Sequence, residues 1–335
     1  MADKSVDRPV DSPVDKPLPP AVFLMGPTAS GKTALAERLA EQWPFEVISV
    51  DSALVYRDMN IGTAKPDDDF LHRLPHHLIN IRNPDESYSA AEFRRDALPL
   101  MQAITERGNI PLLVGGTMLY YKILLEGIAD LPPADEAIRA QILADADIHG
   151  WQVMHERLQA IDPQAAAALH PNHSQRIQRG LEVFYATGET LSSHQARQPK
   201  NIFPYQVSQF ALWTEDRAAL HARILERFEI MMSQGFIEEV AQLRSDYVLD
   251  PDMPSMRAVG YRQVWDYLDN KIDRSQLLEQ GTAATRQLAK RQLTWLRKWP
   301  NLHRLCPDYE QALGGSDPQL SAVNKISSVL QELSL

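Results

Sequence analysis

The sequence predicts a doubly wound α/β fold, in which helices flank a parallel sheet and a helical subdomain interrupts the chain. Short apolar segments alternate with segments whose apolar residues recur at helical spacing, which is typical of parallel strands joined by helices. A glycine-rich segment, Gly-Pro-Thr-Ala-Ser-Gly-Lys-Thr at positions 26–33, follows the first apolar segment. This spacing is that of a phosphate-binding loop between a strand and a helix.

The first part of the chain contains candidate strands that each end in a short loop. They are Ala21–Met25, Phe45–Val50 and Ile110–Val114, with helical patterns at Thr33–Gln42 and Ala90–Arg107 between them. Ligands of doubly wound sheets collect at the carboxyl ends of the strands. We therefore expect the loops 26–33, 51–53 and 115–117 to converge on one crevice.

Strand signals vanish between about residues 131 and 193, where Ala, Gln, Leu and charged residues recur at helical spacing, and the polar segment 192–200 follows. A strand pattern returns at Tyr205–Trp213, and helical patterns follow at Arg217–Arg244, Tyr261–Asn270 and Thr282–Trp299. We therefore predict an α/β core from residues 20–130 and 205–310, and an inserted helical subdomain from 131–204. Residues 1–19 are expected to form a disordered tail, and residues 311–335 a C-terminal tail or helix.

Composition excludes several classes of protein. The chain has 335 residues, 44% of them hydrophobic, which is enough to bury a core in each of two domains. A formal net charge of −10 argues against a globally basic nucleic-acid binder, so any such surface must be a local patch. The one cysteine, Cys306, allows no internal disulfide. No export signal and no apolar segment of membrane-spanning length are present, so we expect a cytoplasmic protein without a membrane partner. We also expect a monomer.

The phosphate-binding loop predicts a site for a diphosphate or triphosphate. Gly26 and Gly31 allow backbone N–H groups to approach phosphate oxygens, Lys32 adds a full charge, and Thr33 can hold Mg²⁺. Arg223 and Arg227 lie four apart on one helical face, where they either neutralise a departing diphosphate or pair with neighbouring glutamates. The candidate diphosphate ligands are Gly26, Pro27, Thr28, Ala29, Ser30, Gly31, Lys32, Thr33, Arg223 and Arg227.

Asp51 directly follows the second strand, beside the phosphate-binding loop, and is the candidate general base. Two other roles stay open for it, capping of the following turn and contact with Mg²⁺ through water. Gly115, Gly116 and Thr117 follow the third strand. They either bring backbone and hydroxyl groups close to a flat substrate or form a plain turn.

The helical segment 282–299 carries a local basic patch. Arg286, Lys290 and Arg297 fall on one face, with Leu288, Trp295 and Trp299 opposite. Residues 286–298 include five basic and no acidic side chains, which favours contact with a phosphate backbone over a merely solvated face. Further basic residues lie in the segments 175–179 and 257–262. The histidine pairs 76–77 and 170/173 have no ligand set at metal spacing, so we expect them in loops or caps.

Together these motifs resemble those of the tRNA dimethylallyltransferases, and the likeness extends from about residue 22 to 299. His173 stands where the family usually has Asp, and Gly180 where it usually has Ala. No zinc-finger pattern follows residue 299, so the bacterial form is the closer likeness. The matching blocks are Gly26–Thr33, Val50–Ala53, Ile61–Pro66, Tyr88–Asp96, Leu113–Thr117, Gln175–Arg179, Arg257–Arg262 and Ala284–Arg297.

The resemblance implies a P-loop NTPase-like parallel sheet core with an inserted helical subdomain that clasps the anticodon stem-loop of tRNA. It also implies that the phosphate-binding loop holds dimethylallyl diphosphate, with Mg²⁺ as cofactor. The implied product is N6-isopentenyl adenosine at position 37 of the tRNA, next to the anticodon. Asp51 would act on the adenine N6, with Thr28, Thr117 and Arg223 as further catalytic residues. The implied tRNA contacts are Asp51, Ser52, Ala53, Leu54, Thr117, Arg139, Gln175, Arg176, Ile177, Gln178, Arg179, Arg257, Ala258, Val259, Gly260, Tyr261, Arg262, Lys290, Arg291, Gln292, Leu293, Thr294, Trp295, Leu296 and Arg297.

Two other functions use part of the same residue set. A P-loop small-molecule kinase would use the loop and Asp51 for phosphoryl transfer, but it leaves the basic helix unexplained. A nucleotide-sensing RNA-binding module would use the basic patches, but it leaves Asp51 unexplained. Label from dimethylallyl diphosphate found in RNA would separate the transferase from both.

Overall fold

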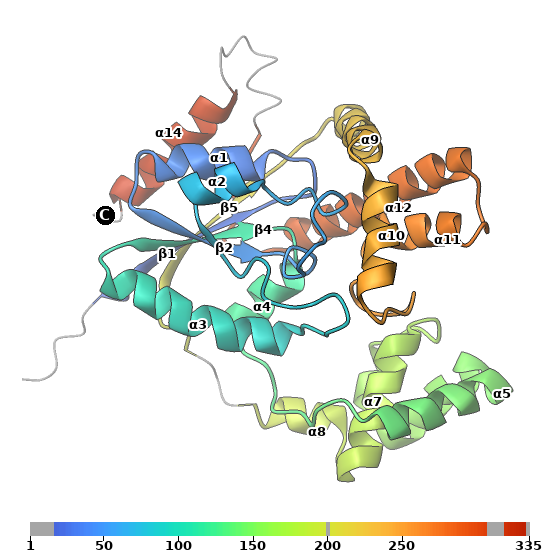
Figure 1. The fold of residues 1–335 in the computed structure, drawn as a ribbon. Helices are drawn as coiled ribbons and strands as arrows, with labels where there is room; N and C mark the ends of the chain where they lie inside the picture. The colour runs from blue at the N-terminus through green and yellow to red at the C-terminus, as the bar shows by residue number, and fades with distance from the viewer. Residues whose placement is uncertain (1–16, 199–201, 307–317, 333–335) are drawn as a thin grey trace, which may run out of the picture. The chain divides into compact units, whose positions relative to one another are not determined.

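The computed structural model describes residues 17–198, 202–306 and 318–332, and these form an α/β core and a helical unit. The core contains a sheet with all strands parallel, in the order β3-β2-β4-β1-β5-β6 (Figure 1). The strands are β1 (Pro20–Met25), β2 (Phe45–Val50), β3 (His76–His77), β4 (Ile110–Gly115), β5 (Gln206–Leu212) and β6 (His303–Leu305).

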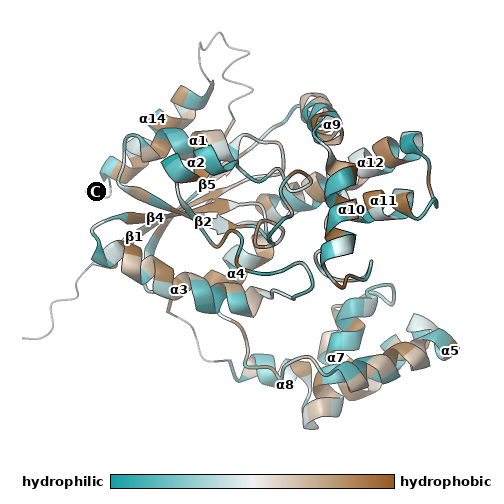
Figure 2. Ribbon diagram, viewed as in Figure 1, coloured by the Kyte–Doolittle hydropathy of each residue, from teal (hydrophilic) through white to brown (hydrophobic). Residues whose placement is uncertain are grey.

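The central strands are apolar along their whole length because helices cover both faces of the sheet. In β4 all residues are buried, and in β1 all but the first. Figure 2 shows these strands as a hydrophobic centre beneath helices with one polar side. The helices α1 (Lys32–Ala40), α2 (Asp68–Arg73) and α14 (Pro318–Glu332) lie on one face, and α3 (Ala90–Glu106) and α4 (Met118–Glu126) on the other (Figure 1).

Between β5 and β6, four helices of the described residues belong to the core. They are α9 (Arg217–Ser233), α10 (Phe236–Asp246), α11 (Tyr261–Leu268) and α12 (Arg274–Arg297). The single helix expected over 217–244 is therefore wrong, because Gly235 has a φ of +97° that favours glycine and ends the helical path between α9 and α10. α12 begins at Arg274, eight residues before the expected start at 282, and Asp273 and Gln276 form a capping box at its N-terminus.

The second compact unit is Leu125–Ile202, against an expected insert at 131–204. It contains α5 (Glu136–Ile161), α6 (Pro163–Ala167), α7 (Ser174–Thr187) and α8 (Leu191–Ala196). Its own core includes Met154, Leu158 and Ile177. A Cβ atom on Gly180 would lie 2.8 Å from Leu158 Cδ1, so the glycine at this position makes room for that leucine.

The C-terminal segment adds to the main core. Ala322, Val323, Ile326 and Leu330 of α14 are buried in the cluster that contains the β1 side chains. The predicted N-terminal tail lies outside the described residues except for residues 17–19. Across the described ranges, no helix has both the length and the apolar character that a bilayer crossing requires.

Candidate active site

The phosphate-binding loop connects β1 to α1 and is shaped by its glycines. Gly31 has a φ of +86°, a conformation that glycine adopts without strain, and it caps the N-terminus of α1. Lys32 folds back over this loop, and its Nζ donates to Gly26 O at 2.9 Å and to Pro27 O at 2.6 Å. Removal of the ammonium from water lowers the pKa of Lys32 to about 7, although the nearby Asp51 acts in the opposite direction.

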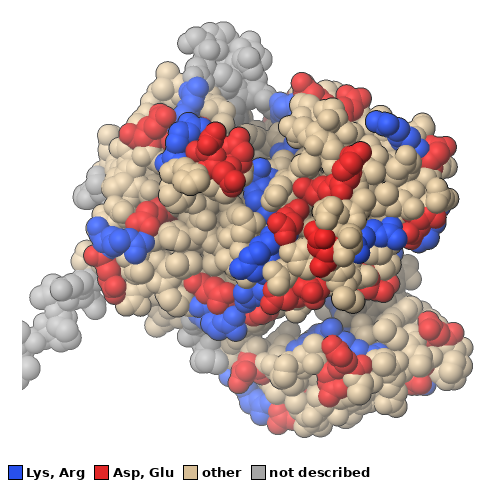
Figure 3. Space-filling model, in the orientation of Figure 1, with Lys and Arg blue, Asp and Glu red and all other residues tan. Residues whose placement is uncertain are grey.

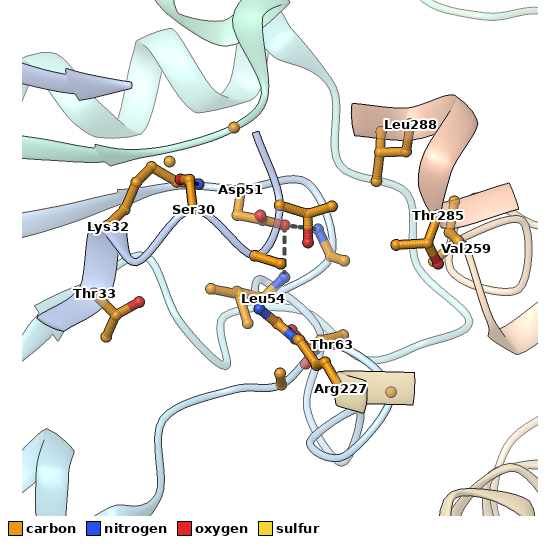
Figure 4. Close-up of a pocket in the computed structure, with 18 of the residues that line it drawn as sticks. Ser30, Lys32, Thr33, Asp51, Leu54, Thr63, Arg227, Val259, Thr285 and Leu288 are labelled. Atoms are coloured by element: carbon orange, nitrogen blue, oxygen red, sulfur yellow. Dashed lines mark hydrogen bonds between the residues drawn. The ribbon is translucent and has the colours of Figure 1, made fainter. Parts of the chain in front are cut away.

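Asp51 lies at the carboxyl end of β2 and faces the same space (Figure 4). Its Oδ1 accepts hydrogen bonds from Ala53 N at 2.8 Å and from Leu54 N at 3.4 Å. The turn-capping role expected as an alternative is therefore real, and it fixes the carboxylate in one orientation. Asp51 also lines the cavity, so capping and a chemical role are compatible.

The loop after β4 closes against the Asp51 loop. A Cβ atom on Gly115 would lie 2.0 Å from Val50 O, so only glycine allows this approach of β4 to β2. Thr117 Oγ1 accepts from Ser52 N at 3.1 Å. Thr117 thus holds the backbone next to Asp51, a contact that the sequence did not reveal.

These three loops meet in one cavity of about 400 Å³, as expected from the strand order. Its polar end is formed by the phosphate-binding loop and Asp51, with Arg227 opposite (Figure 4). Its remaining wall is largely apolar. The apolar lining residues are Leu54, Ile224, Phe228, Met231, Val259 and Leu288.

Of the two candidate arginines of α9, Arg227 lies in this cavity. Burial lowers the pKa of Arg227, while the charge of Asp51 opposes that effect. Arg223 lines a neighbouring hollow, together with Arg227 and residues 29–31 of the loop. The geometry therefore favours Arg227 over Arg223 as the arginine beside Asp51, and the catalytic role expected for Arg223 stays a prediction.

Gln292 of α12 connects two of the loops. Its Oε1 accepts from Thr28 N at 2.9 Å, and its Nε2 donates to Gly116 O at 3.0 Å. The side chain is 9% exposed. A direct tRNA contact was expected here, but the structure gives Gln292 a supporting role beneath the phosphate-binding loop.

The basic face of α12 is present as expected. Arg286, Lys290 and Arg297 line one groove with Arg217 and His221 of α9, whereas Leu288 points into the cavity on the other side of the helix. Leu296 is fully buried, so its side chain does not reach solvent as a tRNA contact requires, and Leu293 is largely buried at the floor of the basic groove. The exposed members of the expected contact set on α12 are Lys290, Arg291, Thr294, Trp295 and Arg297.

The residues of the loop before α11 and of its first turn also divide into exposed and buried members. Arg257 and Arg262 are exposed, and Ala258 and Val259 line the cavity. Tyr261 is fully buried, so its expected contact with tRNA is not supported by the geometry. On the face shown in Figure 3, Lys and Arg side chains are interspersed with Asp and Glu.

In the helical unit, two of the expected tRNA-binding arginines share a buried carboxylate. Arg139 Nε lies 2.9 Å from Glu182 Oε1, and Arg179 Nη1 lies 2.9 Å from Glu182 Oε2. These bonds to arginine lower the pKa of Glu182 against the opposing effect of burial. Gln175 and Arg176 are exposed, and Ile177 is fully buried in the core of this unit.

Of the two histidine pairs expected in loops or caps, His170 and His173 precede α7, whereas His76 and His77 form the edge strand β3, which corrects the expectation for that pair. His173 Nδ1 accepts from His170 N at 3.1 Å, ahead of α7. Among the described residues, no group of three or more His, Cys, Asp and Glu side chains lies close enough to hold a metal ion.

This chain has the fold of the P-loop-like α/β proteins. Its sheet is parallel, Lys32 folds back over the phosphate-binding loop, and Asp51 lies near Lys32 and Arg227. Within that class, the sequence model described as IPP transferase matches residues 54–299. The chain therefore belongs to the IPP transferase family.

Individual relatives agree with this assignment. The chain is 61% identical over 283 residues to a tRNA dimethylallyltransferase of Thiobacillus denitrificans, covering 84% of this chain and 90% of that protein. The structure of the tRNA isopentenylpyrophosphate transferase of Bacillus halodurans aligns with a TM-score of 0.66 at 37% identity, over 94% of this chain and 97% of that one. A eukaryotic dimethylallyltransferase, described as acting on tRNA, aligns with a TM-score of 0.76 at 26% identity, over 94% and 80%.

Proposed function

We propose that this protein transfers a dimethylallyl group from dimethylallyl diphosphate to N6 of adenosine 37, next to the anticodon of tRNA. The observation that carries the proposal is the single cavity in which a phosphate-binding loop, two cations and one oriented carboxylate face an apolar wall. The loop and the cations can bind a diphosphate, the apolar wall can bind a short hydrocarbon chain, and the carboxylate can accept a hydrogen bond from the edge of a purine. The names of the relatives support the same reaction.

The donor would bind with its diphosphate on the phosphate-binding loop. Backbone N–H groups at the start of α1, the ammonium of Lys32 and the guanidinium of Arg227 supply positive charge. The same groups stabilise the charge that grows on the leaving diphosphate in the transition state. The apolar wall, which includes Phe228 and Met231, is suited to the five-carbon chain.

Asp51 would act on the acceptor. The N6 lone pair forms a bond to C1 of the donor, the bond between C1 and the diphosphate oxygen breaks, and the N6 proton passes to the Asp51 carboxylate. Because an aromatic amine is a weak nucleophile, this proton transfer accelerates the attack. The two backbone amides on Oδ1 hold the carboxylate in place before the substrate arrives.

We propose Mg²⁺ as the cofactor. Thr33 is exposed in the first turn of α1 and lines the cavity, and Asp51 lies in the same cavity. Hydroxyl and carboxylate oxygens are the ligands that Mg²⁺ prefers, together with phosphate oxygens of a substrate. When bound, the ion would neutralise part of the diphosphate charge.

The tRNA would be bound mainly through its phosphates. The proposed contacts are the exposed basic residues of α12, Arg257 before α11, Arg262 in the first turn of α11, and Arg176 in the helical unit. The helical unit would clasp the anticodon stem-loop. Because base 37 is normally stacked, the phosphate contacts must also supply the cost of extruding it, a few kcal/mol. We expect the enzyme to act as a monomer in the cytoplasm.

The test is incubation of the protein with Mg²⁺, tRNA and dimethylallyl diphosphate labelled in its prenyl group. Label in the tRNA, and none in a matched tRNA whose position 37 is guanosine, is the expected result. Consumption of ATP with a small acceptor, and no label in RNA, would indicate a kinase instead. If the protein binds tRNA but transfers no label at a saturating donor concentration, the result would indicate an RNA-binding module instead of a transferase.

A further inference from the structure

The loop of residues 60–66 forms one side of the cavity, yet the reaction outlined above assigns it no role. Its sequence is Asn-Ile-Gly-Thr-Ala-Lys-Pro. Gly62, Thr63, Ala64 and Pro66 all line the cavity. The loop belongs to no helix or strand. In addition to hydrogen bonds within it, such as Lys65 N to Asn60 O at 2.9 Å, it is supported by a side chain of another helix.

That support comes from Glu239 of α10. Its Oε2 accepts from Asn60 N at 2.9 Å and from Ile61 N at 2.6 Å, and its Oε1 accepts from Gly62 N at 3.1 Å. Consecutive backbone N–H groups that converge in this way form an anion-binding concavity. Here the anion is a side chain of the protein itself, and hydrogen bonds to a charged acceptor are stronger than neutral ones.

The same carboxylate also holds Tyr261, another residue of the cavity wall. The Tyr261 hydroxyl donates to Glu239 Oε1 at 2.6 Å. Burial, with Glu239 nearby, raises the pKa of Tyr261 well above its usual value, so the phenol keeps the proton that it donates. A Cβ atom on Gly62 would lie 2.1 Å from the Phe236 ring and 2.6 Å from the Tyr261 ring, so the loop lies directly on these aromatic side chains.

The loop reaches the charged part of the site through Thr63. Arg227 Nη2 lies 3.5 Å from Thr63 O, and the charge of Arg227 acts on both Asp51 and Lys32. Figure 4 shows Thr63 beside Arg227, with Asp51 beyond it. A shift of the 60–63 backbone would therefore move a hydrogen-bond acceptor of the arginine that faces the donor.

We propose that Glu239 is a positioning residue for donor binding, which sets the 60–63 backbone and Tyr261 and, through Thr63, the guanidinium of Arg227. This proposal rests on the proposed function for the identity of the donor. It assigns Glu239 no direct contact with either substrate. Its effect should therefore fall on the diphosphate donor and not on tRNA.

The test compares Glu239→Gln with Glu238→Gln, the exposed glutamate at the preceding position of α10. The amide of Gln has one acceptor atom where Glu239 uses both oxygens, so the loop or Tyr261 loses its partner. Steady-state kinetics should show a KM for dimethylallyl diphosphate at least about tenfold higher in Glu239→Gln, with the dissociation constant for tRNA unchanged. Glu238→Gln should match the unmodified protein in both.

A double-mutant cycle separates positioning from general loss of structure. If Glu239 acts through Arg227, the fold-increase in donor KM of the combined Glu239→Gln and Arg227→Gln variant will be well below the product of the fold-increases of the two single variants. Tyr261→Phe, which removes only one hydroxyl, should give a smaller rise in donor KM. Multiplicative effects, an unchanged donor KM, or parallel losses of donor and tRNA binding would each overturn the proposal.

Calorimetric binding of inorganic pyrophosphate keeps this test independent of the reaction. If the unmodified protein transferred no prenyl group, the proposed function would fail. Weaker pyrophosphate binding by Glu239→Gln than by Glu238→Gln would still support the positioning role, and equal binding would refute it.

Discussion

Raising the pH should weaken binding of the diphosphate donor, because the free enzyme holds Lys32 with a pKa of about 7. In the enzyme without donor, Lys32 Nζ contacts two carbonyl oxygens of the phosphate-binding loop, those of Gly26 and Pro27. A bound diphosphate favours the charged ammonium and so restores a higher pKa. Donor binding must therefore take up a proton whenever the free enzyme has lost it.

The size of the effect follows from the pKa. At pH 7 about half of the free enzyme carries a charged Lys32, and at pH 8.5 about 3% does, so the donor dissociation constant should rise about 16-fold between these values. Each further pH unit adds about 1.4 kcal/mol until the pKa of the bound state is reached. Above pH 7.5 the diphosphate itself contributes little, since phosphate groups lose their second proton near pH 6.

Isothermal titration calorimetry of donor binding without tRNA, in buffers of different ionisation enthalpy, counts the protons taken up. We expect about 0.5 proton at pH 7 and nearly one at pH 8.5. Lys32→Arg is the matched control, because a guanidinium stays charged over this range. No proton uptake at pH 8.5, or the same pH dependence in Lys32→Arg, would refute the reasoning.

Three further predictions concern the other parts of the site. Asp51→Asn should lower kcat by about 10²–10⁴ while tRNA binding is kept, and a parallel loss of tRNA binding would reassign Asp51 to RNA contact or folding. Lys290→Ala and Arg297→Ala should each reduce the slope of log Kd for tRNA against log salt by about one unit, whereas Arg274→Ala at the start of α12 should leave it unchanged. Gln292→Ala should lower the free energy of unfolding by about 1–3 kcal/mol in urea titrations, because the buried Gly116 O and the half-buried Thr28 N lose their partner, and a stability equal to that of the unmodified protein would contradict this.

The strands that carry the site could be predicted from the sequence because their apolar runs are long and end in glycine-rich loops. β2 matched the expected Phe45–Val50, and β1 and β4 each differed by one residue. The edge strands β3 and β6 span two and three residues, which is too short for any period to appear. α14 was expected only as a tail or helix, since its packing on the core depends on residues about 280 positions earlier.

Some residues of the site could likewise be predicted from the sequence, and others could not. Lys32 and Asp51 could be found because each belongs to a local motif at a strand end. Gln292 and Glu239 could not be assigned their contacts, because their partners lie 264 and 177–179 residues away in the chain. Arg223 and Arg227 share a helical face in the sequence, and only the packing of α9 against the loops separates their environments.

The strand order also constrains how this protein is made. β1, which carries the phosphate-binding loop, pairs with β5 along its whole length, and β5 is synthesised more than 180 residues later, at 206–212. A nascent chain that has reached the helical unit therefore presents β1 as an open, apolar edge, a form of strand that invites wrong pairing. We expect ribosome-bound chains that end before residue 206 to need a chaperone, and the diphosphate pocket to form only in the last stage of translation.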